Sequence, residues 1–195
     1  MHLYSGSSVD FIADATHNRL TTKLEESFFQ HFRYKVGQSE LRSWQSSLRA
    51  MADVVQLGEM RDHGVIVELQ LPLSSRRLDC MITGHDTDHR SGGVIVELKQ
   101  WEHAGPSWID DCVSTFVGGR ERDVLHPSRQ VGNYERYLLD VHTAFSDGGV
   151  RLRSCSYLHN FRFDAASELF SDRHQDLLER DSDLRRLRVH QGFTD

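Results

Sequence analysis

Cysteine and proline are scarce in this sequence of 195 residues, which contains three of each. The cysteines, Cys80, Cys112 and Cys155, are odd in number and widely spaced, which excludes a dense disulfide framework and fits a reducing compartment. No apolar run approaches the roughly 18 residues of a membrane span. Residues 1–5 carry neither a basic region nor an apolar signal region. We therefore expect a cytoplasmic protein with no membrane partner.

Positive charge is in deficit as well, since 23 Lys and Arg face 29 Asp and Glu, for a formal net charge of -6 at pH 7. The chain as a whole therefore has no electrostatic attraction to nucleic acid. A phosphate-containing substrate would need a local basic patch or divalent cations. The 38% hydrophobic and 27% charged content are ordinary for a globular protein, and the length suits one domain over residues 1–195.

Helical and strand patterns alternate in the first half of the chain. Apolar residues at helical spacing predict a helix over 19–33, and a second helix is expected after Gly37, with Ser39 as its N-cap and Glu40 in its first turn. Three strand patterns separated by short loops then indicate an antiparallel meander. These strands are expected over 64–71, 77–84 and 93–101.

The second half contains an insertion and a further helix and strand. The strand-like runs 112–117 and 120–124 flank Gly118-Gly119, which is typical of a β-hairpin. A helix is expected over about 127–145, and a fourth core strand over 152–161. The order helix, three strands, helix, strand predicts an α/β sandwich with a core over about 38–162.

A charged tail follows over about 164–195, and we expect it to be helical. Leucines are available for its packing, and its arginines are expected to form a solvated face. The leucines are Leu177, Leu178, Leu184 and Leu187, and the arginines are Arg185, Arg186 and Arg188.

A carboxylate and an ammonium end the third predicted strand. Glu97 and Lys99 are separated by one residue, so both point to the same face, and their burial is costly unless it is compensated. Asp79 lies among apolar neighbours in the preceding strand. The charges either form a strand-end ion pair or build a site for a metal and a polar substrate. Two carboxylates, with the backbone carbonyl of Leu98, suit a hard cation such as Mg²⁺, beside which Lys99 would help to activate a water.

Gln130 and Tyr134 stand four residues apart on the predicted helix, hence on one of its faces. In this order, Asp79, Glu97-x-Lys99 and Gln130-x-x-x-Tyr134 resemble the PD-(D/E)XK nuclease superfamily, and the last element is similar to its RecB-like QxxxY branch. Longer sequence segments resemble the N-terminal nuclease-like region of bacterial helicase-linked conserved proteins. These segments are Glu68-Leu69-Gln70-Leu71-Pro72, Arg77-Leu78-Asp79, Glu97-Leu98-Lys99-Gln100-Trp101, His126-Pro127-Ser128 and Tyr157-Leu158-His159-Asn160.

The resemblance implies an αβββαβ restriction-endonuclease-like core, in which helices flank a central mixed sheet, with an inserted hairpin and helical additions at both ends. It implies Mg²⁺- or Mn²⁺-dependent cleavage of DNA, with Asp79 and Glu97 as metal ligands, Lys99 as catalytic lysine, and Gln130 and Tyr134 as support. The chain has no GxxxxGK[ST] motif, so motor activity is not carried over. We expect a stand-alone nuclease domain or a fragment. An alternative is that the chain is the nuclease part of a larger defence or repair assembly with an ATPase or helicase partner.

In this superfamily the first core helix commonly supplies a further carboxylate, which Glu40 would provide here. Glu68 is the alternative. If paired residues of the first hairpin sum to 147, Glu68 faces Asp79, whereas a slip of one residue turns it away. The sequence leaves this choice between Glu40 and Glu68 open.

Basic residues near these positions are candidates for nucleic-acid contacts. Arg76 and Arg77 lie close to Asp79 in the sequence and are expected to contact phosphates. Arg120 and Arg122 suit either a phosphate groove or an ordinary charged hairpin, because acidic residues alternate with them. A second functional hypothesis keeps the fold but makes it a non-cleaving module that binds nucleic acid or protein.

Overall fold

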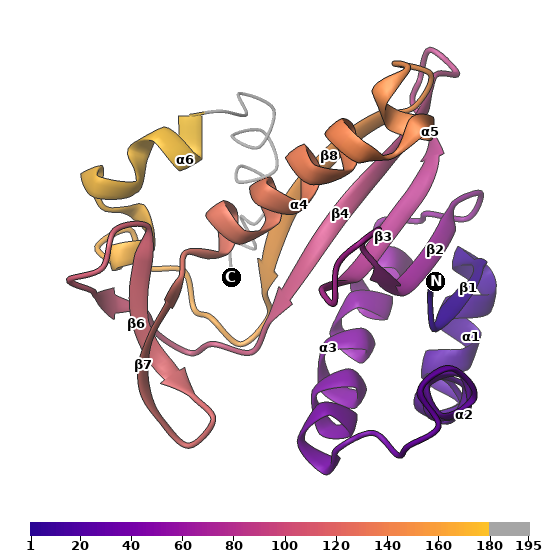
Figure 1. Cartoon of the computed structure of the whole chain (residues 1–195), viewed down its shortest axis with the longest axis horizontal. Coiled ribbons are helices and arrows are strands. Elements are labelled where there is room, and N and C mark those ends of the chain that lie inside the picture. The colour runs from indigo at the N-terminus through magenta and orange to yellow at the C-terminus, as the bar shows by residue number, and fades with distance from the viewer. Residues whose placement is uncertain (180–195) are drawn as a thin grey trace.

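The computed structural model describes residues 1–179 and contains a five-stranded mixed sheet in the order β1-β2-β3-β4-β8 (Figure 1). Neighbouring strands are antiparallel except β4 and β8, which are parallel. The strands are β1 Tyr4–Ser7, β2 Gly64–Gln70, β3 Arg77–His85, β4 Ser91–Lys99 and β8 Arg151–Leu158. The predicted meander is therefore present, and the fourth core strand returns parallel to the third.

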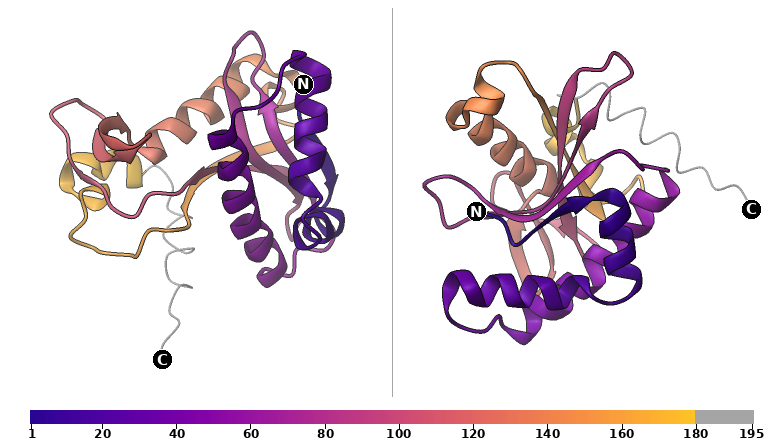
Figure 2. Two further views of the ribbon diagram at one scale, coloured as in Figure 1. Left: turned by 90° about the horizontal axis from the view of Figure 1, so that it is seen from below. Right: turned by 90° about the vertical axis from the view of Figure 1, so that its right-hand side faces the viewer.

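Helices cover both faces of this sheet. The helices are α1 Ser8–Thr16, α2 Leu20–Phe32, α3 Gln38–Leu57, α4 Pro127–Val141, α5 Thr143–Ser146 and α6 Gln175–Glu179, with 3₁₀ turns at Glu168–Phe170 and Asp172–His174. Residues of α1, α2 and α3 form one core with Val65, Val67 and Val96. Residues of α4 form a second core with Leu78 and Ile95 on the opposite face of the sheet. Figure 2 shows the helices on the two faces. The predicted mixed α/β fold with a flanked central sheet is confirmed.

The N-terminal segment holds elements that the sequence did not predict. Strand β1 pairs with β2, and Ser7 then caps α1 by accepting a hydrogen bond from the Asp10 backbone N–H at 3.1 Å. The four residues of β1 are Tyr-Ser-Gly-Ser, which are mostly weak strand formers. Their strand conformation therefore depends on pairing with β2, which lies 60 residues further along the chain.

Two predicted boundaries were wrong. Helix α3 starts at Gln38 with Gly37 in extended conformation as its N-cap, so Ser39 lies inside the first turn and does not cap the helix. The helix expected over 127–145 ends at Val141, because His142 is extended (φ -110°, ψ 115°) and starts the short helix α5.

The insertion forms a separate three-stranded sheet, β5 Gly105–Pro106, β6 Cys112–Val117 and β7 Arg120–Leu125, at the left of Figure 1. Gly118 (φ 63°) and Gly119 (φ 84°) make the turn of the predicted hairpin, where positive φ favours glycine. Trp101, Val113 and Leu169 form a third core between this sheet and the C-terminal segment. The helical tail expected from residue 164 is wrong at its start, because residues 164–167 are not helical and only two 3₁₀ turns and the short helix α6 follow up to Glu179. The tail predictions for Leu184, Leu187, Arg185, Arg186 and Arg188 lie outside the described residues.

The register of the first hairpin agrees with the sum of 147, since Val67 pairs with Cys80 and Leu69 with Leu78. Glu68 lies between these pairs with a φ of 55°, in the left-handed region that a side chain with a Cβ rarely adopts. Val67 packs with the helices α1–α3, and Leu69 packs on the α4 side. The regular alternation of side chains between the two faces of β2 is therefore interrupted at Glu68, whose side chain points towards α3.

None of the helices in residues 1–179 is long and apolar enough to cross a membrane.

Candidate active site

The charged end of β4 meets the first turns of α4. Glu97 Oε1 accepts hydrogen bonds from Lys99 Nζ at 2.8 Å and from Gln130 Nε2 at 2.5 Å. Lys99 Nζ also donates to Gln130 Oε1 at 3.0 Å, and Gln130 Nε2 lies 3.1 Å from the Tyr134 hydroxyl. Four of the predicted site residues therefore form one connected network. The strand alternation places Glu97 and Lys99 on the α4 face, and the helical spacing places Gln130 and Tyr134 opposite them.

The second carboxylate oxygen of Glu97 is the least satisfied group in this network. Glu97 is 3% exposed, and its Oε2 is buried without any hydrogen-bond partner. An unpaired charged oxygen in a protein interior is costly, so native structures supply a partner for such groups. A water or a cation would provide that partner here.

Asp79 lies on the neighbouring strand β3, and its carboxyl group interacts electrostatically with Glu97. Its Oδ2 accepts a hydrogen bond from the backbone N–H of Leu98 at 2.7 Å. Burial raises the pKa of Asp79 most strongly, the charge of Glu97 raises it further, and the Leu98 and Lys99 interactions lower it. The charge of Glu97 on β4 thus disfavours the charged form of Asp79 on β3. This electrostatic arrangement is relieved either by a proton or by a cation.

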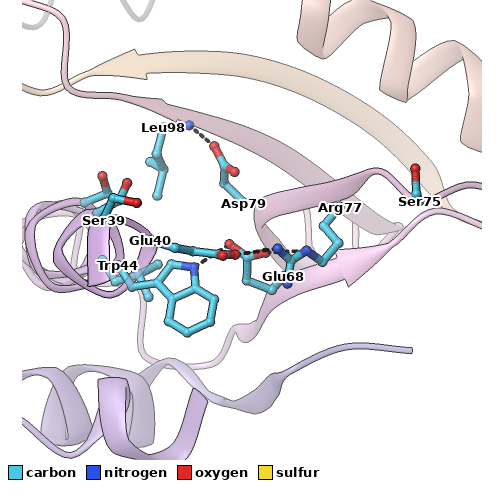
Figure 3. A pocket seen from close by; sticks show the side chains of 11 residues that line it. Ser39, Glu40, Trp44, Glu68, Ser75, Arg77, Asp79 and Leu98 are labelled. Atoms are coloured by element: carbon cyan, nitrogen blue, oxygen red, sulfur yellow. Dashed lines mark hydrogen bonds and ion pairs between the residues drawn. The ribbon is translucent and has the colours of Figure 1, made fainter. Parts of the chain in front are cut away.

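Asp79 also lines a pocket of about 470 Å³ on the α3 side of the sheet (Figure 3). Glu40 and Glu68, the two alternatives for the further carboxylate, line the same pocket. Arg77 lies between them, with Nη2 at 2.5 Å from Glu40 Oε1 and Nε at 3.1 Å from Glu68 Oε2. Trp44 Nε1 donates to Glu68 Oε1 at 2.7 Å. The structure therefore brings both alternatives to the site and pairs both with one arginine.

Burial raises the pKa of Glu68 to about 7, although the Arg77 charge and the Trp44 hydrogen bond act against this shift. The desolvation of the carboxylate thus outweighs two favourable contacts. Glu68 therefore loses its proton at a higher pH than an exposed glutamate does.

Hydroxyl groups on α3 were missed by the sequence reasoning. Ser39, Ser43 and Ser47 line the pocket at intervals of four residues, and Ser47 Oγ lies 3.1 Å from His159 Nε2. Gln100 Nε2 donates to Ser47 Oγ at 3.0 Å. The serine spacing beside an apolar stripe was the sequence signal, because it marks a polar edge of the helix next to its buried face.

The predicted nucleic-acid contacts lie in different surroundings. Arg76 is exposed in the turn between β2 and β3. Arg77 is held by the two glutamates, so a contact with phosphate would require these ion pairs to open. Arg120 and Arg122 are exposed on β7, in the inserted sheet, and neither lines the pocket.

The donor set suits a particular kind of cation. Within residues 1–179, no group of three or more His, Cys, Asp and Glu side chains is arranged to hold a metal ion. Asp79 and Glu97 supply two carboxylates, one with an unpartnered buried oxygen. Mg²⁺ commonly binds through one or two carboxylates and keeps several waters, so the residues fit such a cation. They do not form an all-protein cage of the kind that Zn²⁺ prefers.

Comparisons of the chain with protein-family models, with curated proteins and with solved structures found no match.

Proposed function

We propose that this protein is a Mg²⁺- or Mn²⁺-dependent nuclease that hydrolyses phosphodiester bonds of DNA on a PD-(D/E)XK-type, restriction-endonuclease-like core. One observation carries the proposal. Glu97 accepts hydrogen bonds from Lys99 and Gln130 on one oxygen and keeps the other buried and unpartnered, and its charge raises the pKa of Asp79 on the neighbouring strand. A buried oxygen of this kind needs a partner, and a bound cation would supply one.

Asp79 and Glu97 would hold the cation, with the backbone carbonyl of Leu98 as the proposed third protein ligand. When bound, the cation would neutralise phosphate charge and lower the pKa of a water. Because the chain has a net charge of -6, such a cation would also offset the repulsion between protein and DNA.

Lys99 would act on the reacting phosphate. Its ammonium is held by Glu97 and Gln130, and it lies 5.6 Å from the centre of the Trp101 ring. Its side chain is 17% exposed, so its charge is only partly screened by solvent. A positioned cation of this kind stabilises negative charge that develops on a phosphate oxygen. Gln130 would keep both Lys99 and Glu97 in place, and Tyr134 would orient Gln130.

The test is cleavage of labelled single- and double-stranded DNA by the purified chain with Mg²⁺ or Mn²⁺. Glu97→Gln preserves the size of the side chain and removes its charge. Asp123→Asn removes an exposed carboxylate from the inserted hairpin and is the matched control. We expect cleavage by the parent and the control and none by Glu97→Gln. Equal cleavage by all three proteins would reject the proposal.

A non-cleaving module is the second candidate, and a specific observation favours it: Glu40 and Glu68 are both paired with Arg77. Their pairing leaves two carboxylates for a cation. Mn²⁺ should raise the melting temperature of the parent and leave that of Glu97→Gln unchanged, because a ligand of the native state stabilises it. Such stabilisation without cleavage of any DNA or RNA substrate would favour the module. An ATPase or helicase partner is proposed only as part of a larger assembly.

A further inference from the structure

The guanidinium of Arg77 occupies the acidic side of the pocket. It contacts Glu40 of α3 and Glu68 of β2, from its own position at the start of β3, and Figure 3 shows both carboxylates converging on it. The pocket lining otherwise contains one more carboxylate, that of Asp79. Three carboxylates and one guanidinium thus face the same space of about 470 Å³. In effect, the chain supplies its own cation to an acidic site.

Packing holds this internal cation in position. The guanidinium carbon lies 5.5 Å from the centre of the Phe28 ring and 5.9 Å from that of Phe32, both on α2. Cations at these distances from aromatic rings are attracted to them. The Arg77 side chain is 22% exposed, and its Nη1 is buried without a hydrogen-bond partner. The site therefore retains Arg77 although one of its donors is unsatisfied.

Glu68 reaches Arg77 through an unfavourable backbone conformation. Its φ of 55° lies in the left-handed region, where a residue other than glycine is strained by about 1–3 kcal/mol. This conformation turns the carboxylate away from the side that regular alternation would give, towards Trp44 and Arg77. The contacts of the Glu68 carboxylate with Trp44 and Arg77 therefore offset the strain of its backbone, and the fold keeps the Glu68–Arg77 ion pair in place.

We infer that Arg77 is an internal counter-ion that keeps Glu40 and Glu68 from acting as cation ligands, so that this end of the sheet takes one divalent cation, at Asp79 and Glu97, and not a second one at Glu40 and Glu68. A guanidinium and a divalent cation compete for the same oxygen atoms. Like charges at short range repel, so a second divalent cation beside Arg77 is disfavoured. Arg77 thereby acts as a positioning residue that sets the metal stoichiometry.

This inference rests on the proposed metal site at Asp79 and Glu97, and its test counts bound metal. Mn²⁺ bound per chain is measured at pH 7.5 by electron paramagnetic resonance and by titration calorimetry. We expect one Mn²⁺ for the parent and two for Arg77→Gln, because the Arg77→Gln substitution leaves Glu40 and Glu68 without a counter-ion. Arg77→Met is made in parallel, since its side chain retains packing against Phe28 and Phe32 if the amide variant does not fold.

Two controls separate this effect from a general loss of positive charge. Arg76→Gln removes the adjacent, exposed arginine and should still bind one Mn²⁺. The double variant Arg77→Gln with Glu68→Gln should return to one Mn²⁺, because a ligand of the new site is then missing. Near-ultraviolet circular dichroism confirms that each protein is folded.

The outcomes are distinct. One Mn²⁺ in folded Arg77→Gln or Arg77→Met overturns the inference, as does a count of two in the parent, and both results leave the proposed nuclease standing. A parent that binds no Mn²⁺ overturns the proposed metal site and the inference together. An increase from one to two that the double variant reverses supports the role of Arg77.

Discussion

Glu68 and Glu97 are buried carboxylates at the same end of the sheet, 8% and 3% exposed, yet their surroundings differ. Both oxygens of Glu68 have partners, Trp44 for one and Arg77 for the other. Glu97 has two donors on one oxygen and none on the other. Burial alone therefore does not mark a ligand-binding carboxylate. The unpartnered oxygen is the feature that separates a group available to a ligand from one already committed to the fold.

The two sides of the sheet produce this difference. Glu97 follows the regular alternation of β4 and faces α4, where Gln130 is four residues from Tyr134 and both reach the network. Glu68 departs from the alternation of β2 and faces α3, where Trp44 and Arg77 enclose it. If this comparison is correct, substitutions at the two glutamates should affect different properties.

The largest expected effect is on catalysis. Glu97→Gln should reduce metal-dependent DNA cleavage by about a thousandfold or more, since it removes the charge of a proposed ligand of the catalytic cation. Glu68→Gln keeps the acceptor for Trp44 and should reduce cleavage by about tenfold at most. Rates measured under single-turnover conditions with saturating Mn²⁺ check this. Equal losses at the two positions would remove the distinction between the carboxylates.

Stability should show the opposite ranking. Glu68→Ala leaves Arg77 with one carboxylate and Trp44 without an acceptor, so it should lower the free energy of unfolding by about 3–5 kcal/mol. Glu97→Gln keeps an oxygen acceptor for Lys99 and Gln130 and replaces the carboxylate oxygen that has no partner, so it should change that free energy by about 1 kcal/mol or less. Urea denaturation followed by tryptophan fluorescence measures both values. A larger destabilisation by Glu97→Gln would contradict the comparison.

The pH dependence of stability should distinguish the parent from Glu68→Gln. The pKa of Glu68 is raised to about 7 in the folded protein, so between pH 4.5 and 7 the native state retains a proton that the unfolded state has released. The stabilisation is therefore complete below the unfolded pKa and is lost as the pH rises through 7, by about 3 kcal/mol or less. Unfolding midpoints at pH 5 and pH 8 should differ less in Glu68→Gln than in the parent. Identical pH profiles would show that Glu68 does not titrate in this range.

The smallest expected effect is that of Tyr134→Phe. The Tyr134 hydroxyl contacts Gln130 Nε2, and Gln130 Nε2 contacts Glu97. The hydroxyl therefore affects Glu97 only through Gln130. Removing it should lower cleavage by less than about tenfold and stability by about 1 kcal/mol. Phenylalanine retains the packing of the buried ring in the core that α4 forms with the sheet. Gln130→Leu is the informative companion, because it breaks the contacts to both Lys99 and Glu97 and should reduce cleavage more.

Much of the fold was predictable because the relevant signals are local. The helices over residues 20–32 and 38–57, the three-strand meander and the Gly118-Gly119 hairpin follow from periodicity and turn residues. Strand β1 was not predictable from its own residues, since its conformation depends on pairing with β2. The break after Val141 was missed because His142 lies inside an otherwise helical pattern and adopts an extended backbone.

The site was predictable to a similar extent. The sequence by itself determined that Glu97 and Lys99 share one strand face and that Gln130 and Tyr134 share one helix face, because both follow from the periods of regular elements. Only the tertiary structure decided that Glu68 turns to α3 and that Arg77 pairs with Glu40, 37 residues away in the sequence. The physical reason is that a single left-handed residue reverses the side-chain direction in a strand. Which charges then become partners depends on the packing of α2, α3 and the β2–β3 hairpin against one another.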